Sequence, residues 1–183
     1  MSNAFKDIKE VEDQILLYIR AGVQCIQLVV GGQNGAAEES LKKIAKELGY
    51  SVAVWDCNGG WNGSKEGVNL TEAIDSVSVA NRFDQNTVVM FRDPHYELMQ
   101  NPSPVAAMKG QIQKQAFNTK KNRRPVILLT PSTAMNQDLL PYMKQLVYPL
   151  PSHAHLQSIF EGVRSSISDQ TKRQCSDSLR YQI

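Results

Sequence analysis

The chain has 183 residues, 42% of them apolar, which is enough to bury a core and suits one globular domain with a small appendage. Its 20 basic and 18 acidic residues are spread along the sequence, so no face is marked out for nucleic acid. No apolar run approaches the roughly 20 residues of a membrane helix, and the first residues do not show the charged-then-apolar pattern expected of a secretion signal. Three widely spaced cysteines favour neither zinc nor disulfides, and a cytoplasmic setting fits best.

The apolar pattern predicts one helix and then five short strands. Residues Ile8–Arg20 repeat apolar side chains at helical spacing, and Gly22 is expected to end this helix. Each predicted strand is rich in β-branched residues and bounded by turn formers. The five strands are Cys25–Val30, Val52–Trp55, Val88–Phe91, Val126–Leu129 and Leu146–Leu150.

Helical patterns alternate with these strands. They cover Ala36–Leu48, Leu70–Phe83, Val105–Asn118 and Gln137–Lys144, while 58–69 and 101–104 are expected to be breaks. Strands that are apolar throughout and alternate with helices predict a parallel sheet covered on both faces. We therefore expect a three-layer α/β domain with five parallel strands over residues 5–150.

The character of the sequence changes after Leu150. Pro151 breaks the fifth strand, and Ser152 can cap a helix that runs to about Ile167. The last residues have a helical pattern, and the sequence stops without a helix cap or a polar tail. We expect 151–183 to be a separate helical segment and the native chain to continue past Ile183.

The stretch LVVGGQNGAAEES, residues 28–40, has the form of a strand, a Gly-rich turn and a helix. A phosphate loop would read GxxxxGK[ST], with a lysine on the phosphates and a hydroxyl on magnesium. Counted from Gly31 or from Gly32, the lysine position holds Ala37 or Glu38, and the hydroxyl position holds a glutamate in both frames.

The glycines Gly31, Gly32 and Gly35 therefore predict a strand-to-helix turn that needs positive φ, without phosphate chemistry. Glu38 and Glu39 would complement the helix dipole in place of a ligand. Should a nucleotide bind, this turn is where it is expected.

Two further strand ends resemble parts of a nucleotide site. In TVVMFRDPHYEL, Asp93 follows an apolar strand as a magnesium-binding acid would, but Arg92 precedes it and Pro94 stands where a water-activating glutamate belongs. Thr130 ends the fourth strand, where a polar sensor residue would sit, although a threonine before Pro131 is also ordinary turn chemistry.

Other reactive residues offer no better site. The basic run Lys120, Lys121, Arg123 and Arg124 could touch phosphates, but without interleaved aromatics it reads as a solvated loop. His153 and His155 are spaced for different helix faces, and Cys25 and Cys57 at strand ends read as small apolar residues. Trp55 is expected in the core, and Trp61 is interpreted as an exposed contact residue.

The blocks VQCIQLVV, LKKIAKELGYSVAVWD, RDPHYEL, VILLTPS and VYPLPS resemble the chloroplast and cyanobacterial open-reading-frame AAA+ ATPase family over about Ile8–Val163. In RDPHYEL, Asp93 and His95 are similar to that family's KDxH element. The resemblance implies a P-loop NTPase-like fold of the AAA+ or RecA-like kind, a degenerate phosphate loop and, over 151–183, the start of a helical lid or a linker. It also implies a location in the cytoplasm or the plastid stroma.

Three functions remain open from the sequence. The first is a non-catalytic ATPase-like module without a cofactor, which regulates or binds a catalytic AAA+ module in the same or a neighbouring chain, with a homo-oligomer as a further arrangement. The second is an ATPase that binds ATP and magnesium through an atypical loop, with Arg92 replacing the lysine. The third is a RecA-like nucleic-acid-binding domain that uses the run from Lys120 to Arg124.

Overall fold

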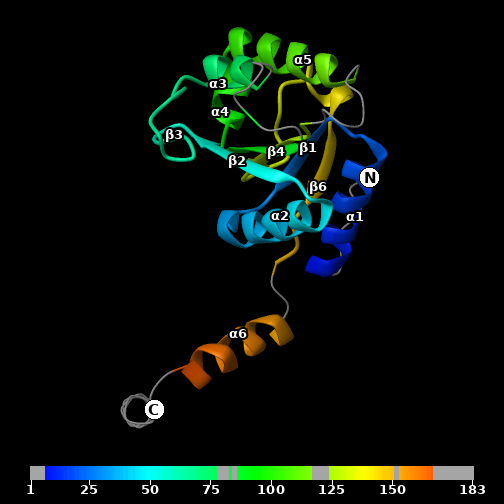
Figure 1. Ribbon diagram of the computed structural model, residues 1–183, viewed down its shortest axis with the longest axis vertical. Helices are drawn as coiled ribbons and strands as arrows, with labels where there is room; N and C mark the ends of the chain where they lie inside the picture. Colours follow the sequence, from blue (N-terminus) through cyan, green and yellow to red (C-terminus); the bar gives the residue numbers. More distant parts are fainter. Residues whose placement is uncertain (1–6, 78–82, 84–85, 117–123, 151–152, 167–183) are drawn as a thin grey trace. The chain divides into compact units, whose positions relative to one another are not determined.

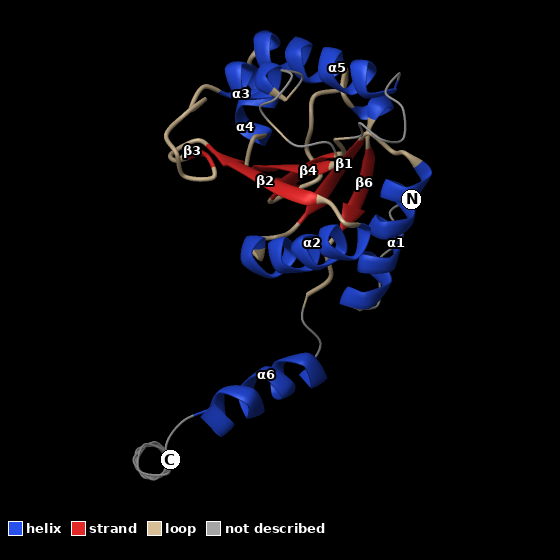
Figure 2. Ribbon diagram, in the orientation of Figure 1, coloured by secondary structure: helices blue, strands red, loops and turns tan. Residues whose placement is uncertain are grey.

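The computed structural model describes residues 7–77, 83, 86–116, 124–150 and 153–166 (Figures 1 and 2). The elements in chain order are α1 (Ile8–Ala21), β1 (Cys25–Val29), α2 (Asn34–Leu48), β2 (Ser51–Asp56), β3 (Gly60–Trp61), α3 (Leu70–Ser76), β4 (Thr87–Arg92), α4 (His95–Gln100), α5 (Pro102–Ala116), β5 (Val126–Thr130), the 3₁₀ turn η2 (Leu140–Tyr142), β6 (Lys144–Val147) and α6 (His153–Ser166). No helix of these residues is long and apolar enough to cross a membrane.

The chain forms two compact units, Met1–Pro149 and Leu150–Ile183. The first unit contains the sheet and the helices α1 to α5, and the second contains α6. The domain limits 5–150 and 151–183, and a lid or linker role for the second part, stay predictions.

The strand order in the sheet is β3-β2-β4-β5-β1-β6. Five strands are parallel, as expected, and the two-residue strand β3 adds an antiparallel edge beside β2. The predicted count of five was therefore too low by one. A two-residue strand inside a Gly-rich loop has too few residues to show an alternating pattern, so β3 has no local signal in the sequence.

Helices cover both faces of the sheet, which confirms the predicted three layers (Figure 2). On one face, Val11 and Ile15 of α1 and Leu41 of α2 pack against strand residues such as Leu28 and Met90. The other face carries a second cluster, which includes Ile74 of α3, Leu98 of α4 and Met108 of α5. The strand side chains alternate between these two clusters, so every central strand is buried on both sides.

Helix α1 begins and ends where the sequence predicts. The side chain of Asp7 accepts a hydrogen bond from the backbone N–H of Glu10, which satisfies one of the unpaired N–H groups in the first turn. Gly22 ends the helix with φ 84°, a left-handed conformation that glycine adopts without a steric cost.

Three sequence predictions were wrong in the second half of the sheet domain. Helix α4 was missed because Pro94 reads as a break, yet Pro94 stands at the N-cap of this helix, and α5 already begins at Pro102. The helix predicted over 137–144 is only the short turn η2, which contains Pro141. The last strand is Lys144–Val147 and not Leu146–Leu150, because its exposed lysine and glutamine hid it as an edge strand.

Other predicted ends fall outside the described residues. The helix expected over Leu70–Phe83 is described as α3 as far as Ser76, and residues 78–82 are not described. The same holds for 117–118, at the end of the helix expected over Val105–Asn118, and for Ser152 and Ile167, the expected limits of the last helix.

The Gly-rich loop after β2 is closed around Trp61, which corrects the interpretation of this residue as an exposed contact. Trp61 is only 3% exposed, its ring packs edge-on against Phe83 and Phe91, and its Nε1 donates to Ser76 Oγ at 3.1 Å. Gly60 has φ 64°, and a Cβ atom there would overlap the carbonyl oxygen of Glu66. Trp55 lies in the core, as predicted.

Candidate nucleotide site

The carboxyl ends of the parallel strands form the edge at which α/β folds of this kind bind ligands. Here that edge brings together the turn after β1, Asp56 at the end of β2, Arg92 at the end of β4 with Asp93 directly after it, and Thr130 at the end of β5. The sequence places each of these polar residues directly at a strand end. Their neighbourhood was therefore predictable, but not the contacts among them.

The turn between β1 and α2 is shorter than a phosphate loop. Gly31 and Gly32 have φ values of 52° and 89°, as the sequence predicts, and both are exposed. Helix α2 already begins at Asn34, so Gly35 lies inside the helix. Residues 32–35 would wrap a phosphate after Gly31, and the last two of these four are therefore helical. The N–H of Gln33 is bonded to the Val30 carbonyl at 2.8 Å.

The earlier start of α2 also corrects the position of its two glutamates. Glu38 and Glu39 were expected in the first turn of α2, but they lie in the second turn. Their charges therefore do not complement the helix dipole at the first turn. Glu39 is exposed and pairs with Lys42 at 2.7 Å. Glu38 lies on the inner face of α2, in line with buried Leu41, and it points toward the sheet edge.

Glu38 forms a two-pronged ion pair with Arg92. The Nε and Nη2 atoms of Arg92 donate to the two carboxylate oxygens of Glu38 at 2.5 and 2.7 Å. Arg92 follows Val88 and Met90 on the α2 face of β4, and this alternation aims its side chain at the helix. The planar guanidinium group matches a carboxylate in this geometry as it would match a phosphate.

Asp56 completes the cluster from the neighbouring strand. The register that pairs Trp55 with Phe91 sets Asp56 next to Arg92, and Nη1 of Arg92 donates to its Oδ2 at 3.3 Å. Hydrogen bonding to Glu38 is the main reason that the pKa of Arg92 is raised, and the charge of Asp56 adds to it. Arg92, the cation considered as a substitute for the missing lysine, is therefore held by two carboxylates of the chain itself.

Asp93 lies beside the β1–α2 turn, as the sequence suggests for an acid at this strand end. It is exposed, it has φ 49°, and its Oδ2 accepts a hydrogen bond from Asn34 Nδ2 at 3.1 Å. His95, the other residue of the RDPHYEL block, opens α4, and its buried Nδ1 has no hydrogen-bond partner within the described part of the chain.

Thr130 is fully buried and holds a loop in place. Its Oγ1 accepts from Gln27 Nε2 at 3.0 Å and donates to the carbonyl of Ser132 at 2.9 Å. Gln145 of β6 joins this network by donating to Gln27 Oε1 at 2.6 Å. The hydroxyl thus serves the turn after β5, which is the alternative that the sequence left open for this residue.

Arg124 is built into the fold. Its guanidinium donates to the carbonyls of Val77 and Phe83 at 2.6 and 2.8 Å, and its backbone N–H donates to Gln115 Oε1 at 3.1 Å. The other members of the predicted basic run, Lys120, Lys121 and Arg123, lie outside the described residues.

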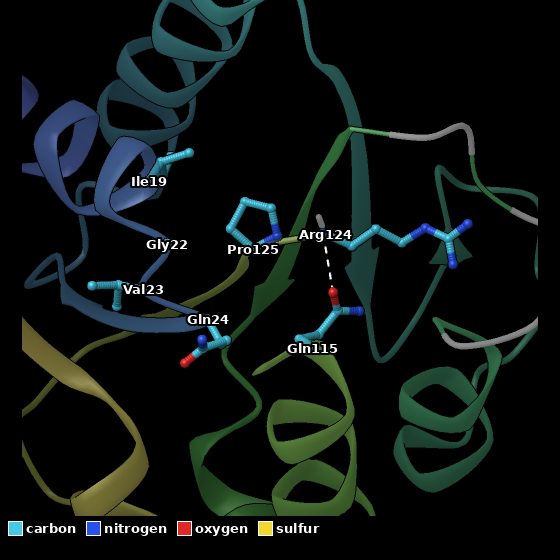
Figure 3. Close-up of a pocket in the computed structure, with 7 residues that line it drawn as sticks. All are labelled: Ile19, Gly22, Val23, Gln24, Gln115, Arg124 and Pro125. Atoms are coloured by element: carbon cyan, nitrogen blue, oxygen red, sulfur yellow. Dashed lines mark hydrogen bonds between the residues drawn. The ribbon is translucent and has the colours of Figure 1, made fainter. Parts of the chain in front are cut away.

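Arg124 and Gln115 also line a small cavity together with Gly22 and Val23, on the edge opposite the candidate site (Figure 3). Its volume of about 10 Å³ has room for roughly one water molecule. This cavity cannot hold a nucleotide.

The cysteines and histidines add no reactive centre among the residues described. Cys25 is fully buried, and burial raises the pKa of its thiol to about 12, so the prediction of a small apolar role is confirmed. Cys57 is exposed, so that prediction was wrong for it. No group of three His, Cys, Asp or Glu in the described ranges is arranged to hold a metal, and the side chains of His153 and His155 lie outside them.

Tested against ATP and magnesium, this edge does not fit. There is no lysine in the turn, the turn is too short to wrap a phosphate, and Glu38 occupies the guanidinium group that could have bound one. Sequence reasoning found the missing lysine but not the Arg92–Glu38 pair, which joins residues 54 positions apart. The strand-end placement of Arg92 was its one available signal.

The three layers and the strand order are those of a P-loop NTPase-like α/β domain, although its strand-end site lacks a phosphate loop. Residues 11–146 match the sequence profile described as the N-terminal domain of SpoVK-like AAA ATPases. The chain belongs to that family. No curated protein is detectably similar to it in sequence.

Solved structures of AAA+ proteins share the fold. RuvB from Thermotoga maritima, solved as a mutant, superposes with a TM-score of 0.52 at 17% identity, over 86% of this chain and 50% of RuvB. A chain of the HORMA:CdnC:Trip13 complex from E. coli MS115-1 gives 0.50 at 11% identity, over 79% of this chain and 65% of that one. The chain thus spans less than two thirds of either relative.

Proposed function

We propose that this domain is a non-catalytic, ATPase-like interaction module of a larger AAA+ protein, and that it packs against a catalytic AAA+ module in the same or a neighbouring chain. The observation that carries the proposal is the Arg92–Glu38 pair. A carboxylate of the chain itself takes the two guanidinium donors that a phosphate would need. A nucleotide would have to displace a fixed internal anion before it could bind.

The β1–α2 turn supports the same proposal. A phosphate loop binds through backbone N–H groups held open around the anion. Here the turn closes on itself through Gln33 and Val30, and α2 starts before such a cradle could form. Even if Arg92 were released, the donors that orient a triphosphate would still be missing.

The family supports the interaction role. Its profile describes an N-terminal domain of an AAA ATPase, and the chain covers only 50% and 65% of two AAA+ relatives. One of these relatives was solved in a complex with other proteins. We infer that a catalytic module elsewhere performs hydrolysis, and that the chloroplast and cyanobacterial branch is the part of the family to which this chain is nearest.

Isothermal titration calorimetry with ATP and magnesium tests the non-catalytic role. We expect no binding at millimolar nucleotide for the wild-type chain. Binding at micromolar affinity, with turnover that Asp93→Ala abolishes, would replace the proposal with an ATPase that has an atypical loop. An Arg92→Met variant then decides whether Arg92 substitutes for the lysine, because hydrolysis that survives this change excludes it.

The interaction role needs a separate measurement. The ATPase rate and the sedimentation profile of the catalytic module should be measured with and without this domain, either in one chain or mixed. We expect the domain to change at least one of them. If both stay unchanged over a tenfold molar excess, the regulatory role is wrong even if no nucleotide binds.

A further inference from the structure

A groove lies at the amino ends of the parallel strands, on the edge opposite the candidate nucleotide site. Its volume is about 630 Å³, and it runs between the end of α1, the helix α5, the turn η2 and the start of β6. Gly22, Val23 and Gln24, which Figure 3 shows beside the small cavity, line the groove as well. A hollow of this size suits several side chains of a bound segment.

The floor of the groove is apolar. Ile112 of α5 and Met143 before β6 are buried, and Val23 and Tyr142 are partly exposed at its surface. Tyr142 is the last residue of the turn η2, and the backbone becomes extended at Met143 directly after it. Apolar side chains of a partner would lose water against these four residues, which supplies the attraction.

The charge at the groove has one sign. Lys144, the first residue of edge strand β6, is exposed and lines the groove. Nζ of Lys109 lies 5.5 Å from the centre of the Tyr142 ring. Within the described part of the chain, ten residues line the groove, and none of these is an aspartate or a glutamate. An acidic partner therefore meets complementary charge and no repulsion from the lining, whereas a basic one meets two ammonium groups.

We propose that this groove docks an acidic protein segment, which inserts apolar side chains over Ile112 and Met143 and sets its carboxylates against Lys144 and Lys109. This inference rests on the proposed interaction function and names the surface and the chemistry of the partner. A nucleic acid could use the two lysines but would leave the apolar floor unused. For this reason the proposal is a protein segment.

The probe is a random 12-residue peptide library displayed on phage and selected on the wild-type chain. We expect the selected peptides to combine aspartate or glutamate with aliphatic or aromatic anchors. Their affinity, measured by fluorescence anisotropy, should fall at least tenfold in Lys144→Glu. The matched control Lys46→Glu makes the same charge change on the exposed face of α2 and should bind within twofold of wild type.

A charge exchange makes the test specific. Selected peptides in which the acids are replaced by lysine should bind Lys144→Glu more tightly than the wild-type chain. Exposed Gln113→Glu, which adds a carboxylate to the rim, should weaken the original peptides independently of Lys144. Far-ultraviolet circular dichroism of each variant confirms that the fold is retained.

Four results would overturn the inference. They are no enrichment, enrichment of basic peptides, affinity that is unaffected by Lys144→Glu, and displacement of the peptides by an oligonucleotide at equal concentration. The proposed function is judged by calorimetry and by the ATPase rate. A domain that alters the catalytic module but selects no acidic peptide would keep its function and use a different surface.

Discussion

Arg92 and Glu38 are joined by two hydrogen bonds of 2.5 and 2.7 Å, which tie the end of β4 to the second turn of α2. The Glu38 side chain is 7% exposed and that of Arg92 is 39% exposed. The carboxylate of Glu38 is therefore almost completely buried, while the guanidinium of Arg92 remains partly exposed to solvent. The pair is best regarded as an internal clasp across the edge where nucleotide-binding relatives of this fold would bind phosphate.

Breaking this pair should destabilise the domain. Glu38→Gln sets a neutral, buried amide against the guanidinium and leaves Asp56 as the carboxylate partner of Arg92, so we expect the free energy of unfolding to fall by about 1–3 kcal/mol in urea denaturation. Exposed Glu39→Gln is the matched control and should stay within about 0.5 kcal/mol. In a double-mutant cycle with Arg92→Met, the two losses should not add, and additive losses would show that the residues act independently.

Cys25 should make the domain less stable at alkaline pH. Because burial raises its pKa from 9.0 to about 12, the folded state keeps the thiol proton that the unfolded state releases. Its contribution is complete below pH 9 and is lost as the pH rises toward 12, by at most about 1.4 kcal/mol for each pH unit. Urea midpoints at pH 8 and 10.5 should differ less in Cys25→Ala than in wild type.

The pKa of Tyr148 is also raised by burial and acts in the same direction, so Tyr148→Phe should flatten the pH dependence further. Exposed Cys57→Ala, which removes a thiol outside the core, is the matched control. An unchanged slope in Cys25→Ala would show that this thiol does not control the alkaline transition.

Two glycines of the loop around Trp61 should respond differently to alanine. Both have positive φ, 64° at Gly60 and 75° at Gly63, but a Cβ atom meets the backbone of Glu66 only at Gly60. Gly63→Ala should cost about 1–2 kcal/mol of unfolding free energy, and Gly60→Ala about 2–5 kcal/mol because the backbone must also shift. Tryptophan fluorescence should move to longer wavelength in Gly60→Ala alone, and equal losses would contradict the close contact.

Arg124 should behave as a structural residue. Arg124→Met removes the donors to the carbonyls of Val77 and Phe83, so we expect a loss of about 1–3 kcal/mol in thermal or urea unfolding. Arg124→Lys keeps the charge but not the planar fork, and it should recover little of that loss. Exposed Lys114→Met should be nearly neutral. A stable Arg124→Met variant that loses binding to DNA or RNA at low salt would restore a nucleic-acid role.

Much of the fold could be predicted from local patterns. Four of the five parallel strands were visible because each is a short apolar run between helical repeats, whereas β6 begins with an exposed lysine and glutamine. The end of α1 was visible because Gly22 has few substitutes at positive φ. The missed elements are those with weak local signals. Strand β3 has only two residues. Helix α4 follows Pro94, whose fixed φ is compatible with the start of a helix as well as with a break.

The residues of the candidate site could be predicted from the sequence, but the contacts among them could not. The glutamate in place of a lysine is a local fact, and the placement of Arg92 at a strand end predicts the edge on which it lies. Glu38 lies one helical turn before buried Leu41, so this spacing alone puts it on the inner face of α2. Its contact with Arg92 depends on how α2 packs against the sheet, which local spacing does not specify.

Because the turn after β1 is short, this chain differs from a nucleotide-binding sequence by more than one substitution. A domain that had lost only its lysine could regain it by one substitution. Here a lysine at Ala37 would point from a completed helical turn, with Gly31 and Gly32 alone left to bend. A phosphate loop at this place would require inserted residues before Asn34 as well as a broken Arg92–Glu38 pair, so no single substitution could create one.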